Sequence, residues 1–142
     1  MKASDLMIGD WMQDITPCVI DAVSNEDICT YRNEIGYVTA NPSNLKPIPL
    51  TAEILERNGF KYDGSGQMSM MFLSKPQFSE GIRFNIYVGL KKKTIEVFAA
   101  HPIEKSPNWR KSNKVFLEVC GCYVHELQHA LRLCGIDKDI EL

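Results

Sequence analysis

Residues Tyr123–Ile136 read YVHELQHALRLCGI and carry the clearest helical pattern in the chain. At 100° per residue, one apolar stripe runs along this segment and is formed by Val124, Leu127, Leu131 and Cys134. The opposite side carries His125, Glu126 and His129. Gly135 follows the pattern directly, and glycine commonly ends helices. The segment therefore predicts an amphipathic helix from Cys122 or Tyr123 to Cys134 that buries its leucines.

The same segment contains HELQH, which has the H-E-x-x-H form of a helical zinc site. In such a site two imidazoles one turn apart, here His125 and His129, share a zinc ion, and the intervening Glu126 acts as general base. A catalytic zinc also needs a third protein ligand, and the one remaining histidine, His101, lies upstream in a polar loop. We therefore expect His125 and His129 to be solvent-facing or hydrogen-bonding helix residues without a cofactor. A zinc-dependent hydrolase is the alternative.

The N-terminal part of the chain shows short strand-like runs separated by turn residues. The runs are WMQ, TPCVIDAV, DICTY, IGYVTA and LKPIPL. Gly9, just before the first run, permits the tight backbone that starts such a sheet, because glycine accepts positive φ. This spacing predicts a small, strongly bent sheet over residues 1–48, which we compare with an SH3-like barrel.

Residues 49–142 predict a second module that mixes helices and strands. Thr51 is a good N-cap for AEILER, and Gly59 is placed to end a helix of about two turns. The runs QMSMMFLS, GIRFNIYVGL, TIEVFAAH and VFLEV alternate in part and should form an antiparallel sheet of three or four strands. The C-terminal helix should pack on this sheet, and the tail IDKDIEL should lie on the surface. The expected fold class is therefore α+β, with two helices packed on the second sheet.

Basic residues gather in one part of a chain whose net charge is only −2 at pH 7. Residues 1–48 contain seven acidic and three basic residues, whereas the segment 75–114 is rich in lysine and arginine. The candidates for contacts with nucleic-acid phosphates are Lys91, Lys92, Lys93, Arg110, Lys111 and Lys114. Three consecutive lysines in GLKKKT are more typical of a solvated hairpin turn. Nucleic-acid binding is therefore a second alternative.

Several function classes lose support from what the chain lacks. It has no run of the ~20 apolar residues needed to cross a bilayer, and its N-terminus lacks the apolar core of a secretory signal. We expect a cytoplasmic protein with no membrane partner. The five cysteines are unevenly spaced, which favours reduced, buried thiols over a disulfide framework. Neither a G-x-x-x-x-G-K phosphate loop nor a G-x-S-x-G elbow is present.

Three segments together, SDLMIGDW, PIPLTAEILERNGF and YVHELQHALRLCGI, resemble a family of short proteins found in phages, prophages and mobile elements of gut Bacteroidetes. That family carries a D-L-x-I-G-[ND]-W segment, then P-I-P-L-T-x-E-[IL]-L, then V-H-x-L-Q. The resemblance implies that Val124, His125, Leu127 and Gln128 are the recurring helix residues and that Glu126 and His129 are incidental. It carries over no catalytic residue and no ligand.

No motif selects one activity by itself. Together with the resemblance, the incomplete zinc pattern favours a non-enzymatic accessory or protein-binding protein of a phage or mobile element. Its partner would be an unidentified protein.

Overall fold

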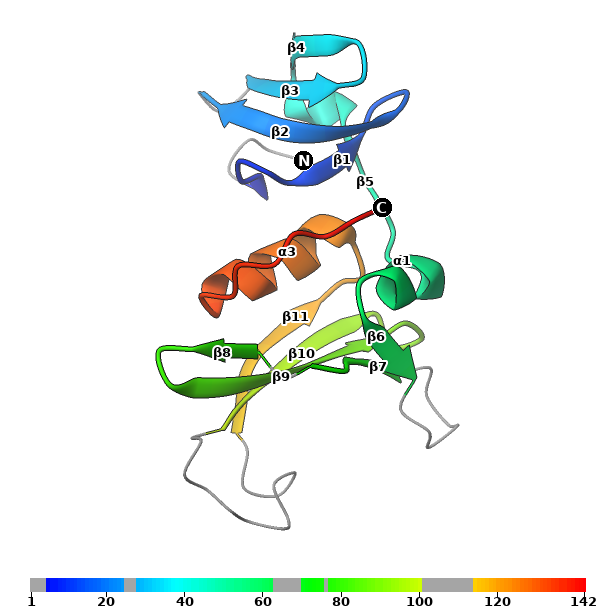
Figure 1. Ribbon diagram of the computed structural model, residues 1–142. Helices are drawn as coiled ribbons and strands as arrows, with labels where there is room; N and C mark the ends of the chain where they lie inside the picture. Colours follow the sequence, from blue (N-terminus) through cyan, green and yellow to red (C-terminus); the bar gives the residue numbers. More distant parts are fainter. Residues whose placement is uncertain (1–4, 25–27, 63–69, 76, 101–113) are drawn as a thin grey trace. The chain divides into compact units, whose positions relative to one another are not determined.

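The computed structural model describes residues 5–24, 28–62, 70–75, 77–100 and 114–142. These residues form two antiparallel sheets and two α-helices, so the α+β class is confirmed (Figure 1). Two compact units are present, one formed by Met1–Pro49 with Tyr123–His125 and the other by Leu50–Cys122 with Glu126–Leu142. Within the described ranges, no helix has the length and apolarity needed to cross a membrane.

The first unit contains a five-stranded sheet whose strands occur where the sequence predicts them. They are β1 (Trp11–Gln13), β2 (Pro17–Val23), β3 (Cys29–Asn33), β4 (Gly36–Ala40) and β5 (Lys46–Pro47). The order across the sheet is β4-β3-β2-β1-β5, and every neighbouring pair is antiparallel. A 3₁₀ turn, η2 (Pro42–Asn44), precedes the last strand. Because β4 and β5 lie at opposite edges, the pairings of the described residues form an open sheet and do not show a closed barrel.

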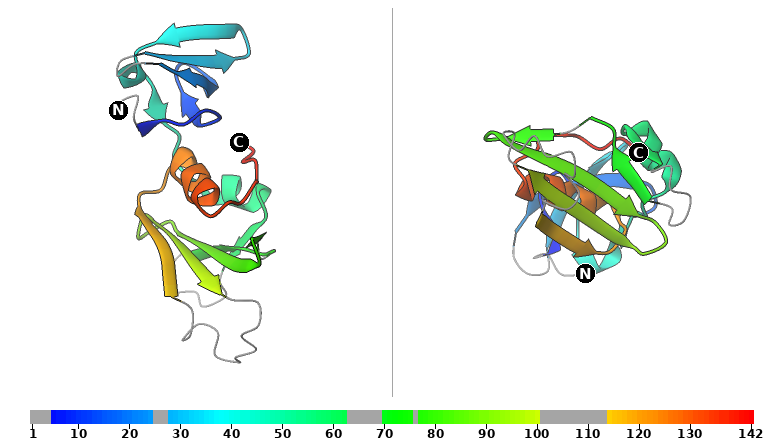
Figure 2. Two further views of the ribbon diagram at one scale, coloured as in Figure 1. Left: turned by 90° about the vertical axis from the view of Figure 1, so that its left-hand side faces the viewer. Right: turned by 90° about the horizontal axis from the view of Figure 1, so that it is seen from below.

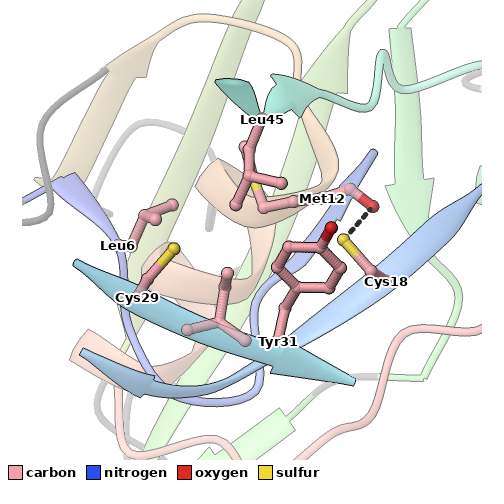
Figure 3. Packing of buried hydrophobic residues seen from close by; sticks show 7 residues of the cluster. Leu6, Met12, Cys18, Cys29, Tyr31 and Leu45 are labelled. Atoms are coloured by element: carbon pink, nitrogen blue, oxygen red, sulfur yellow. Dashed lines mark hydrogen bonds between the residues drawn. The ribbon is translucent and has the colours of Figure 1, made fainter. Parts of the chain in front are cut away.

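The core of this unit consists of aliphatic and sulfur-containing side chains and one tyrosine, contributed by the sheet and by the segments beside it (Figure 3). Its buried members are Leu6, Met12, Cys18, Ile20, Cys29, Tyr31 and Leu45. The Cys18 thiol donates to the Met12 carbonyl at 3.5 Å, and burial raises its pKa to about 11. The Tyr31 hydroxyl donates to Asp14 at 2.7 Å, and this hydrogen bond is the main reason that its pKa rises to about 12. Both groups therefore stay neutral at physiological pH.

The second unit begins with the predicted short helix, α1 (Ala52–Arg57). The Thr51 hydroxyl accepts the backbone N–H of Ile54 at 3.2 Å, so the predicted N-cap is confirmed. Gly59 has φ of +88°, as expected for a residue that ends a helix in the left-handed region. Leu55 and Phe60 are both buried, and they anchor the helix to the strand that follows.

That strand belongs to a six-stranded antiparallel sheet, which is larger than the three or four strands predicted. Its members are β6 (Phe60–Tyr62), β7 (Met70–Leu73), β8 (Gln77–Ser79), β9 (Ile82–Gly89), β10 (Thr94–Ala100) and β11 (Lys114–Cys120). The order is β11-β10-β9-β7-β6, with β8 also paired to β9. Sequence patterns did not predict β6 and β8, which have three residues each and no clear alternation of their own.

One face of the six-stranded sheet carries both helices, as the two directions of view in Figures 1 and 2 show. Buried residues alternate along the strands, for example Phe84, Ile86 and Val88 in β9. The C-terminal helix, α3 (Val124–Leu133), buries the whole predicted stripe. Gly135 ends the helix with φ of +69°, and the N–H of Ile136 bonds the Leu131 carbonyl at 2.9 Å, which is the Schellman pattern.

The C-terminal tail IDKDIEL lies on the surface only in part, because Asp137, Asp139 and Glu141 are exposed but its two isoleucines are not. Ile136 and Ile140 are buried. The side-chain amide of Asn58, at the end of α1, donates to the Glu141 carbonyl at 2.7 Å and accepts the Glu141 N–H at 2.9 Å. It also donates to the Ile54 carbonyl at 2.8 Å. The tail is held because its two isoleucines find apolar cover and its backbone finds a side-chain partner.

Replacing Asn58 by alanine should therefore destabilise the protein. Asn58 is buried, and its loss leaves the polar groups of Glu141 and Ile54 without these bonds, at a cost of about 2 kcal/mol. Asn44→Ala is the matched control, because Asn44 is exposed and should change the free energy of unfolding by less than about 0.5 kcal/mol. Urea unfolding of both variants measures the difference. Equal effects would contradict the role given to Asn58.

Candidate functional site

The histidines of HELQH lie in different environments within the first turns of α3. His125 is buried, with 8% of its surface exposed, and its ring stacks on that of Tyr123 at 6.0 Å between centroids. His129 is half-buried. Of the two expected possibilities, solvent-facing or hydrogen-bonding, burial leaves only the second for His125. At 100° per residue, the buried residues of the helix cover about 220° of its circumference, so burial extends well beyond the apolar stripe and includes Gln128.

Glu126 is packed tightly against the chain that leads into the helix. A Cβ atom placed on Gly121 would lie 2.0 Å from the nearer carboxylate oxygen of Glu126, so a larger residue there would make the end of the Glu126 side chain move. Glu126 is also in the first turn of α3, where a negative charge interacts favourably with the helix dipole. The position of Glu126 can therefore be explained by its structural role, without a role as a general base that acts on a metal-bound water.

The metal hypothesis receives no further ligand from the described parts of the chain. No group of three or more histidine, cysteine, aspartate or glutamate side chains is arranged there to hold a metal ion. His101 and the basic candidates Arg110 and Lys111 lie outside the described residues. Within the part of the chain that the structure describes, the zinc hypothesis thus rests on His125, His129 and Glu126.

The five cysteines have unequal exposure. Cys18, Cys29 and Cys134 are buried free thiols, as predicted, whereas Cys122 is half-buried and Cys120 is exposed. Burial raises the pKa of Cys122, and the nearby negative charge of Glu126 raises it further. Burial also raises the pKa of Cys29. Because the thiolate is the nucleophilic form, these thiols are poor nucleophiles at neutral pH.

The basic candidates do not form one surface within the described chain. Lys91, Lys92 and Lys93 are exposed and lie in the turn between β9 and β10, so the predicted hairpin is confirmed. Lys114 begins β11, while Cys120 at its other end pairs with Thr94 beside the turn. At about 3.3 Å per residue, the backbone of Lys114 is therefore roughly 20 Å from the lysine turn.

The face of the six-stranded sheet opposite the helices carries three aromatic side chains in contact. Tyr87 lies between Phe98, at 5.6 Å with an edge-to-face angle of 89°, and Phe72, at 6.2 Å. Acidic residues continue the same row, because Glu96 is paired with Tyr87 and Glu118 with Glu96. The aromatic side chains on this face could stack with nucleic-acid bases. The negative charges of the two glutamates, however, would repel the phosphates of a nucleic-acid backbone.

A second row of side chains crosses the outer face of the five-stranded sheet. The strand registers place Trp11 beside Val19, Val19 beside Arg32, and Arg32 beside Tyr37. Side chains of directly paired residues lie on the same face, and this row is opposite to the buried Met12, Cys18 and Tyr31. Arg32 is exposed and Tyr37 keeps 66% of its surface in solvent, while Trp11 and Val19 are half-buried. We call these four residues the outer row.

Sequence reasoning did not single out the outer row as a site. Arg32 and Tyr37 were part of strand patterns, and only the register between strands shows that they share a face with Trp11 and Val19. The usable signal was the alternation in CTYRN, where Tyr31 is buried and Arg32 exposed.

Comparisons of the chain with models of protein families, with curated proteins and with solved structures gave no match. The resemblance to the phage and mobile-element family stays a prediction from the three sequence segments.

The placement of HELQH predicts that purified protein carries little zinc. Tight zinc binding needs at least three protein ligands, and HELQH supplies two histidines while the carboxylate of Glu126 lies against Gly121. Protein prepared without chelator should therefore hold less than roughly 0.1 zinc ion per chain. The His129→Ala variant should hold the same amount. Elemental analysis of both proteins measures this. Near-stoichiometric zinc that disappears in His129→Ala would support the hydrolase alternative instead.

Proposed function

We propose that the protein is a non-enzymatic, protein-binding accessory protein of a phage or mobile element, and that the outer row makes the contact with its partner. The protein would act in the cytoplasm. The single observation that supports this proposal most is the outer row itself: Trp11, Val19, Arg32 and Tyr37 follow one another across four strands.

The composition of the outer row is that of a protein interface. Tryptophan, tyrosine and arginine are the residue types most enriched among those that dominate binding energies. The row is held on paired strands, so a partner would meet side chains whose backbone positions are already fixed. Such preorganisation lowers the entropic cost of binding.

An SH3-like architecture of the first unit is part of the same proposal. Its support is the strand order β5-β1-β2-β3-β4, with a 3₁₀ turn before the last strand. The register of β2 with β3 shifts between Ile20 and Ala22, and such a bulge increases the local bend and twist of a strand. A small sheet bent in this way presents its outer row on a curved surface.

A non-catalytic role also agrees with where the HELQH residues lie. His125 and Gln128 are buried, and Glu126 is fitted against Gly121. His125 also stacks on Tyr123, and Glu126 lies in the first turn of α3, where its charge is favourable, so these positions support a structural role for the motif.

Nucleic-acid binding is the second candidate, and the contact of Phe72, Tyr87 and Phe98 favours it. Aromatic side chains on a sheet stack bases, at roughly 1–3 kcal/mol per base. The proximity of Glu96 and Glu118 weakens this candidate, as does the separation of Lys114 from the lysine turn.

Arg32 and Lys46 offer a matched test, because both are exposed bases on strands of the same sheet. Partners captured from host cells would be identified, purified and titrated against each variant. We expect Arg32→Ala to weaken binding at least about tenfold, as for a central interface arginine, and Lys46→Ala to change it less than about threefold.

Binding that is unchanged in Arg32→Ala would contradict the role of the outer row. A labelled single-stranded oligonucleotide provides the other arm of the test. Binding to it that weakens steeply with salt and is lost in Tyr87→Ala would favour nucleic acid over protein.

A further inference from the structure

Within the described chain, some edge strands of the two sheets carry features that discourage pairing with another strand, and one does not. Natural proteins protect an exposed edge with short strands, charged residues, proline or bulges, because an open edge recruits another strand. In the first sheet, β5 has two residues, one of which is Lys46 and the other Pro47. In the second sheet, β6 and β8 have three residues each, β6 includes Lys61, and β11 carries Glu118 and a register shift against β10. These edges are short or protected.

The remaining edge, β4, has none of these features. It reads GYVTA, without charge or proline, and its pairing with β3 continues over five residues with no shift in register. Among the residues that the structure describes, it pairs with β3 alone, and it lies at the margin of its sheet (Figure 1). Its three central residues are exposed, including Val38 at 36%. An uncharged, regular, five-residue edge is suited to the addition of a strand.

We propose that β4 pairs with β4 of a second copy of the chain, antiparallel and centred on Val38, so that two five-stranded sheets form one continuous ten-stranded sheet. A two-fold axis at Val38 sets Val38 opposite itself and Tyr37 opposite Thr39 of the second copy. The first is an apolar pair and the second an aromatic pair with a β-branched residue, and both kinds stabilise cross-strand contacts.

Charge is what favours a second copy as the occupant. Residues 1–48 contain seven acids and three bases, and two copies of one acidic unit would repel each other if an acid lay on the edge. The nearest exposed acid, Glu34, is in the β3–β4 turn and in this register would lie opposite Pro42 of the second copy. Two copies of the uncharged β4 can therefore pair without bringing like charges together. A basic peptide, by contrast, would find no acidic side chain on β4 to pair with.

The size of the contact predicts a weak association. Five residues per copy fall well short of the ~800 Å² per partner that a standard interface buries. We therefore expect a dimer that dissociates on dilution. It would bring two outer rows into one assembly, because Tyr37 belongs both to the outer row and to β4.

Sedimentation velocity over about 1 to 500 μM tests the pairing with full-length protein, and charge swaps at Val38 make it specific. The wild type should shift from monomer toward dimer with concentration. Val38→Lys and Val38→Glu should each weaken this association roughly fivefold or more, because like charges then lie opposite each other. An equimolar mixture of the two variants should associate again. Ile15→Lys, at a position that is 89% exposed in the β1–β2 turn, is the control and should behave as the wild type.

The outcomes decide between pairing and its absence. A wild type that stays monomeric over the whole range would overturn the proposal, whatever the variants do. Dimerisation that persists unchanged in both Val38 variants would also overturn it, because the contact would then lie elsewhere. Association restored only in the mixture supports it and at the same time shows that both variants fold.

Discussion

Burial of the apolar side of α3 is the constraint on which the second unit depends. Leu127, Ala130 and Leu131 are almost completely buried, and with the inward residues of β9 and β10 they supply a large part of the buried apolar side chains of this unit. At about 25 cal/mol per Å² of apolar surface, two buried leucines contribute roughly 3–6 kcal/mol, a large fraction of the stability of an ordinary domain. The Schellman pattern at Gly135 then turns the chain so that Ile136 and Ile140 are buried as well.

The same constraint determines what the polar residues of HELQH can do. A helix that buries about 220° of its circumference leaves its histidines little freedom to approach a common ion. The Glu126 carboxylate lies close to Gly121, and a side chain at that position would displace it. The motif therefore matches a zinc site in its amino-acid sequence, whereas its structural environment is that of a packed helix terminus.

The sequence allowed much of the fold to be predicted, for identifiable physical reasons. A long strand such as β9 showed its period of two, and Thr51, Gly59 and Gly135 marked helix ends through capping chemistry that is local in the chain. What it did not reveal depends on contacts distant in sequence. The bonds of Asn58 to Glu141 span 83 residues, and the outer row exists only once four strands are placed in register. The burial of His125 was missed because an apolar stripe marks the centre of a buried surface and not its limits.

Native-state hydrogen exchange on the amides of Leu127 to Leu131 tests most directly whether α3 is the structural centre of the second unit. If it is, these amides exchange only when the whole unit unfolds, and their opening free energies equal the free energy of unfolding measured with urea. Opening free energies several kcal/mol lower, with β9 and β10 still protected, would show that α3 detaches from a sheet that is stable without it. That result would contradict the account and make the helix a mobile element.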